Sequence, residues 1–144
     1  MKIILTLLYF STLFVSFAQD SNDLGRLSYE AAKSKAYTQY NGEPCGEKEN
    51  VIFKYCFEDG TFILYIFEKN VLNAIVFFEP YLTKTLAEKE LENQVLEFSK
   101  GLGKGPEYSK GEAVFNVSSD IRCIYRIDED EGTYYVRFGT HYLK

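Results

Sequence analysis

Few residues of the chain could carry out chemistry. Its 144 residues include one histidine, His141, and three cysteines. A zinc site needs several histidine, cysteine or carboxylate ligands, and no such set is suitably spaced. No nucleophile stands in a recognisable pattern with a base. The sequence therefore predicts no enzyme, no catalytic residues, no metal site and no cofactor.

Two segments that resemble ligand-binding loops have simpler explanations. The glycine-rich residues 101–105 follow a predicted helix, whereas a phosphate-binding loop precedes one, so they indicate a helix end. The acidic residues 128–131 lack the alternating ligand spacing of a calcium loop and indicate a solvated hairpin tip. Neither segment predicts a ligand site.

The three cysteines allow three single disulfides, each leaving one thiol free. Cys123 lies on the apolar side of a predicted strand, so we expect a buried free thiol. Cys56 lies on the opposite side of an earlier strand, and Cys45 lies in the loop that leads to that strand. We therefore favour a Cys45–Cys56 disulfide, as expected for an exported chain. The alternative is that all three cysteines are reduced.

The first 18 residues have the pattern of a secretory signal peptide. Lys2 precedes the uncharged, mostly apolar residues 3–17, and small residues lie before Gln19. This run is shorter than the roughly 20 residues that span a membrane, so an anchor or a buried helix is the less favoured alternative. The Phe17-Ala18-Gln19 junction resembles those of exported bacterial proteins. We expect residues 19–144 to be secreted or periplasmic, in the bacterial envelope, with no membrane span after cleavage.

The composition predicts one compact domain in residues 19–144. Hydrophobic residues make up 46% of the chain and charged residues 26%, which excludes a disordered or low-complexity chain. The net charge is −5, whereas general nucleic-acid binders are usually basic. A nucleic acid is therefore not an expected partner.

Hydrophobic periodicity divides the domain into two helices and six strands. Asp59-Gly60 and Lys69-Asn70 indicate tight turns between the first three strands. Thr85 and Glu88 form a capping box at the start of the second helix. The expected helices cover residues 28–40 and 85–102, and the expected strands cover 51–58, 61–68, 71–79, 112–118, 121–128 and 133–142.

The element order α-βββ-α-βββ predicts an α+β fold. Its simplest packing is a two-layer one, with two helices on one face of an antiparallel sheet of about six strands. Two separate three-stranded sheets are the alternative. The repeated order indicates a tandem duplication, with an offset of about 60 residues that aligns Tyr65 with Tyr125, Val76 with Val136 and Phe78 with Phe138. The order is similar in architecture to the secreted β-lactamase inhibitor proteins, but no motif is shared, so the similarity implies no site residues.

Alternation along the strands assigns the two faces of the sheet. With two-residue turns, the helix-covered core face carries Phe53, Tyr55, Phe57, Phe62, Leu64, Ile66, Ile75 and Phe77. The opposite face, called the open face from here on, carries Ile63, Tyr65, Phe67, Val76, Phe78, Arg122, Arg126, Tyr135 and Arg137. Three of the four arginines of the chain lie there. A four-residue loop after Asp128 would place Arg126 opposite Tyr135 and Arg137 opposite Ile124.

Aromatic residues and arginine are the types that most often anchor interfaces. We therefore expect a non-enzymatic binding protein whose open face takes a partner protein or a second copy of the chain. Its predicted binding residues are Tyr65, Phe67, Phe78, Arg122, Arg126, Tyr135 and Arg137. The alternative is a carrier of a small apolar or anionic ligand, held in a cavity between sheet and loops behind Phe67 and Phe78. A plain solvated face, with its arginines paired to Asp120 and Asp128, would carry no function.

Overall fold

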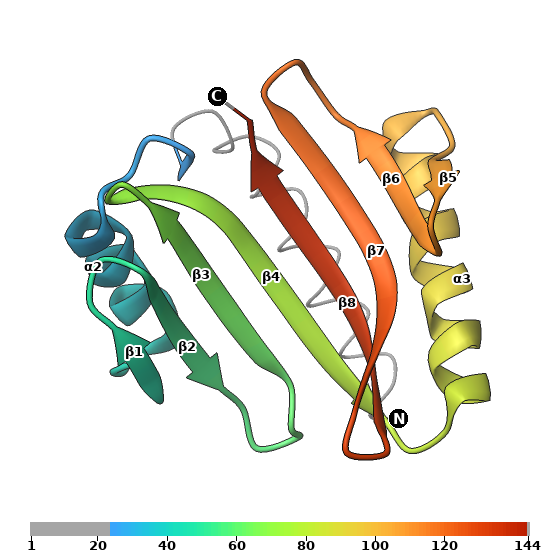
Figure 1. Cartoon of the computed structure of the whole chain (residues 1–144), viewed down its shortest axis with the longest axis horizontal. Coiled ribbons are helices and arrows are strands. Elements are labelled where there is room, and N and C mark those ends of the chain that lie inside the picture. Colours follow the sequence, from blue (N-terminus) through green and yellow to red (C-terminus); the bar gives the residue numbers. More distant parts are fainter. Residues whose placement is uncertain (1–23, 144) are drawn as a thin grey trace.

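The computed structural model describes residues 24–143, which form two helices and one eight-stranded antiparallel sheet (Figure 1). The predicted signal peptide lies outside the described residues. The strand order in the sheet is β1-β2-β3-β4-β8-β7-β6-β5. The elements are α2 (Tyr29–Tyr40), β1 (Gly46–Lys48), β2 (Ile52–Cys56), β3 (Phe62–Glu68), β4 (Val71–Tyr81), α3 (Lys84–Leu102), β5 (Glu107–Ser109), β6 (Glu112–Asn116), β7 (Ile121–Asp130) and β8 (Thr133–Tyr142).

The predicted fold class is confirmed, but the predicted strand number is too low. The two additional strands, β1 and β5, are three-residue edge strands whose residues are all exposed. Hydrophobic periodicity does not predict these two strands because they bury no apolar side chain. The alternative of two separate sheets is wrong, since β4 and β8 pair from Ala74–His141 to Tyr81–Tyr134.

Each half of the chain is one helix followed by a four-stranded meander, and β4 and β8 join the halves at the centre of Figure 1. The turns before β4 and β8 both use two residues of positive φ, Lys69-Asn70 and Glu131-Gly132. Phe77 pairs directly with Phe138, and both lie on the helix-covered face. The predicted alignments of Val76 with Val136 and of Phe78 with Phe138 are therefore one residue out of step, because they match residues on opposite faces.

Both helices have side-chain caps at their first turns. Ser28 accepts a hydrogen bond from the Ala31 backbone N–H, and Thr83 accepts one from Leu86. The second helix therefore starts two residues earlier than the predicted cap at Thr85. Left-handed residues end the two helices, at Asn41 and Gly103.

Both helices pack on the same face of the sheet. Tyr29 of α2 contacts Phe53 and Phe67 edge-on, at ring-centroid distances of 5.6 and 5.1 Å. Phe98 of α3 contacts Phe115 at 4.8 Å, together with Tyr125 and Phe138. The core is thus an aromatic layer between the sheet and the two helices.

The predicted faces are correct for β2 and, from Ala74 on, for β4, but they are reversed for β3. Cys56 pairs with Phe62, because a five-residue connection replaces the predicted two-residue turn at Asp59-Gly60. A β-bulge follows Ile66 and shifts the pairing of β3 with β4 by one more residue. A one-residue shift moves every side chain of a strand to the other face. The two shifts cancel between β2 and β4, so β3 alone changes sides.

Candidate interaction surface on the open face of the sheet

Five of the seven predicted binding residues lie on the open face: Phe78, Arg122, Arg126, Tyr135 and Arg137. The predicted placement of Tyr65 and Phe67 there is wrong. Their exposed fractions are 4% and 6%, and both belong to the helix-covered core. The Tyr65 ring stacks on Phe53 at 4.5 Å, and its hydroxyl lies 3.2 Å from the Tyr40 hydroxyl. These two residues therefore have a structural role.

Alternate residues of β3 take their place on the open face: Phe62, Leu64 and Ile66 are partly exposed there. Sequence reasoning missed them because it assigned the wrong face to this strand. Phe62 stacks on Phe78, with ring centroids 4.5 Å apart and an interplanar angle of 12°. Tyr135 meets both rings edge-on, at 5.6 and 6.3 Å. We call these three residues, Phe62, Phe78 and Tyr135, the open-face aromatic cluster.

Two cations flank the open-face aromatic cluster. The Lys54 ammonium lies 4.0 Å from the Phe62 ring centroid. The Arg137 guanidinium carbon lies 5.7 Å from the Phe78 ring centroid. These are cation–π distances, so each cation adds an electrostatic attraction to the stacked rings.

The arginines do not have the predicted cross-strand partners. β7 and β8 are joined by a two-residue turn rather than a four-residue loop, so Arg126 lies opposite Arg137, and Tyr135 lies opposite Asp128. One row of paired residues thereby crosses the sheet, with Phe62 on β3, Phe78 on β4, Arg137 on β8 and Arg126 on β7. Two like charges directly opposite each other on a sheet repel.

Arg126 has two carboxylate partners. Its guanidinium lies 2.9 Å from Glu112 Oε1 and 2.7 Å from Asp128 Oδ1. Desolvation opposes the charged form of Arg126, but the hydrogen bonds to Asp128 and Glu112 raise its pKa. Of the two acids expected to pair with the arginines, Asp128 does so, whereas Glu112 replaces Asp120.

Arg137 is held less firmly. Its guanidinium reaches Asp128 at 3.7 Å, and its side chain is only 20% exposed. Burial and the neighbouring Arg126 charge lower the pKa of Arg137. Arg122, the third arginine, donates from Nε to the Asn116 side chain at 3.2 Å and stays exposed.

His141 lies beside the arginines on the open face. It lies between Ala74 of β4 and Arg122 of β7 in the pairing register. Its ring packs over Gly139, where an added Cβ would lie 2.8 Å from His141 Nε2. Burial lowers the pKa of His141, and the charge of Arg137 lowers it further. At neutral pH the histidine is therefore uncharged.

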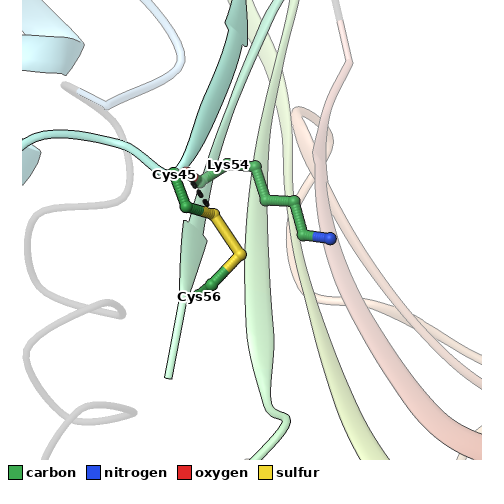
Figure 2. The surroundings of a disulfide bond; sticks show 3 residues. All are labelled: Cys45, Lys54 and Cys56. Atoms are coloured by element: carbon green, nitrogen blue, oxygen red, sulfur yellow. Dashed lines mark hydrogen bonds between the residues drawn. A yellow bond between two sulfur atoms is a disulfide. The ribbon is translucent and has the colours of Figure 1, made fainter. Parts of the chain in front are cut away.

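The edge of the first meander is fixed by a disulfide. Cys45 and Cys56 are joined by a 2.09 Å S–S bond, with their Cα atoms 5.9 Å apart, which is the pairing favoured from the sequence. Figure 2 shows it beside Lys54, whose carbonyl accepts a 2.8 Å hydrogen bond from the Cys45 backbone N–H. The bond ties the segment before β1 to β2, the strand that carries Lys54. Cys123 is the buried free thiol expected from the sequence, and burial raises its pKa to about 11.

Residues 24–143 contain no group of three or more His, Cys, Asp or Glu side chains placed to hold a metal ion. Within the same residues, neither helix is both long and apolar enough to cross a membrane. Comparison of the chain with protein-family models, curated proteins and solved structures finds no match.

Proposed function

We propose that the protein is an exported, non-enzymatic binding protein of the bacterial envelope, which captures a partner protein through the open face of its sheet. The observation that carries the proposal is the open-face aromatic cluster. Three rings in mutual contact lie on the face opposite both helices, with Arg137 beside them. All three rings are partly exposed.

The chemistry of this surface supports protein binding. Aromatic residues and arginine dominate the energetically important centres of interfaces, because they bury a large area for little conformational entropy. Strands also hold their side chains in fixed positions, which lowers the entropic cost of association. Exposed apolar side chains that gather in one place on a surface are a common mark of interaction sites.

A carrier function has less support. The cavity expected for a carrier lay behind Phe67 and Phe78, and these residues lie on opposite faces of the sheet. A single cavity between the sheet and one set of loops therefore cannot be lined by both Phe67 and Phe78. A second copy of the chain remains an alternative occupant of the open face, and the oligomeric state tests it.

The test is capture of a partner by immobilised protein from the envelope and secreted fractions of the producing cells. Wild-type protein is compared with Phe78→Ala and with Tyr108→Ala, a matched loss of an aromatic ring that is 76% exposed on β5. We expect the same partner to be captured by wild type and Tyr108→Ala, and lost with Phe78→Ala. Equal capture by a folded Phe78→Ala variant would refute the proposal. A monomer by light scattering would exclude the second copy.

A further inference from the structure

Arg137 is a half-buried cation with little compensation. Within residues 24–143 its guanidinium makes a single ion pair, at 3.7 Å to Asp128, and no hydrogen bond. That carboxylate is already held by Arg126, at 2.7 Å through Nε and 3.2 Å through Nη2. Guanidinium groups have five N–H donors, so residues 24–143 leave most donors of Arg137 unused.

The charges around Arg137 add to this lack of compensating interactions. Arg126 lies directly opposite on β7, and Arg122 lies on the same face of β7, opposite the uncharged His141. The carboxylates beside them are Glu112 and Asp128, both of which bind Arg126. A chain with a net charge of −5 thus concentrates three of its four arginines at one place. Burying a cation with few partners costs stability, and an incoming anion that pairs with Arg137 would relieve this cost.

The unused donors adjoin the aromatic rings. The Arg137 guanidinium carbon lies 5.7 Å from the Phe78 ring centroid, and Tyr135 precedes Arg137 by two residues on the same face of β8. An anion bound by Arg137 would therefore place its neighbouring atoms against Phe78 and Tyr135. This favours an anion attached to an apolar group over a free inorganic one.

We propose that Arg137 anchors a carboxylate of the partner protein, so that the partner's docking segment carries an acidic group next to an apolar or aromatic side chain. The proposal rests on the function proposed above. Guanidinium and carboxylate match in two parallel hydrogen bonds, which gives this contact directional specificity. A phosphate or sulfate group would also be attracted by the charge of Arg137, but its binding would not depend on contact with the adjoining aromatic rings.

The test uses two small probes that differ only in charge. N-acetyl-phenylalanine carries a carboxylate at neutral pH, and N-acetyl-phenylalaninamide is its neutral equivalent. Each is titrated at millimolar concentrations into isotope-labelled protein, and the amide resonances of Phe78, Tyr135 and Arg137 are followed by NMR. We expect saturable shifts with the carboxylate and about tenfold weaker binding of the amide, as for the loss of one strong charge-assisted contact.

Variants then assign the difference to one side chain. Arg137→Gln should bind both probes equally weakly, and Arg137→Lys should keep only part of the preference, because it retains the charge without the planar donor pair. Arg26→Gln removes an arginine outside the open face and should behave as wild type. Melting temperatures confirm that each variant is folded.

Three results would overturn the inference. They are an absence of shifts with the carboxylate probe, an unchanged preference in Arg137→Gln, or equal shifts with inorganic sulfate alone. None of these affects the proposed function, which depends on loss of partner capture by Phe78→Ala. If Phe78→Ala abolishes capture and Arg137→Gln does not, the surface is correct and the carboxylate anchor is wrong.

Discussion

The assignment of β3 side chains to the two faces makes a sharp prediction about stability. Phe67 is 6% exposed and contacts Tyr29 and Phe53, with ring centroids 5.1 and 5.5 Å away. Truncation of such a buried ring, Phe67→Ala, should cost about 3–5 kcal/mol of the free energy of unfolding. Phe78 is partly exposed, and its principal contact is the stacked ring of Phe62. Phe78→Ala should cost about 1–2 kcal/mol.

Guanidinium denaturation followed by circular dichroism measures both free energies of unfolding. A loss of several kcal/mol approaches the whole stability of a domain of this size, so Phe67→Leu provides a milder variant at the same position. It should fall between wild type and Phe67→Ala. The reasoning would be refuted if Phe78→Ala were the more destabilised variant, because Phe67 would then lie on the solvent side of the sheet.

Three further predictions concern the disulfide, His141 and Cys123. Replacing both Cys45 and Cys56 by serine should lower the free energy of unfolding by about 2–3 kcal/mol, because the bond closes a short loop with a sequence separation of 11; a variant as stable as wild type would contradict this. Burial and Arg137 lower the pKa of His141 below its ordinary value of 6.5, so the unfolded chain takes up the proton first and stability falls as the pH drops below about 6.5. His141→Gln should make the melting temperature less dependent on pH over about pH 7 to 5, and an unchanged dependence would show that the histidine is solvated. Burial raises the pKa of Cys123 to about 11, so its thiol should resist a thiol-specific reagent at about pH 8 until the protein unfolds; rapid reaction of native protein would contradict its burial.

Much of the architecture could be predicted from local signals. Turn residues such as Asn70 and Gly132 have the positive φ expected of them, and the stripe of Tyr29, Ala32 and Ala36 on α2 is buried as its spacing predicts. Alternation predicts the correct face for β4 beyond its bulge, as Phe77 shows. The edge strands β1 and β5 could not be predicted, because three exposed residues leave no periodic pattern.

The candidate site was predictable on three of its four central strands. Phe78, Arg137 and Arg126 face the predicted side because β4, β7 and β8 alternate without interruption in this region. Phe62 was missed because β3 is apolar on both faces, so composition alone does not tell its sides apart. Its side is set by the connection from β2 and by the bulge beside β4, each of which shifts the pairing register by one residue.

The most direct test of the open face as the binding surface is a cross-saturation NMR measurement on the protein bound to its captured partner. Saturation of the partner's protons passes only to residues in contact with it. We expect the effect at Phe62, Phe78 and Tyr135, with little at α2 and α3 on the opposite side of the sheet. Saturation confined to the helices, or to the edge strands β1 and β5, would contradict the proposed function.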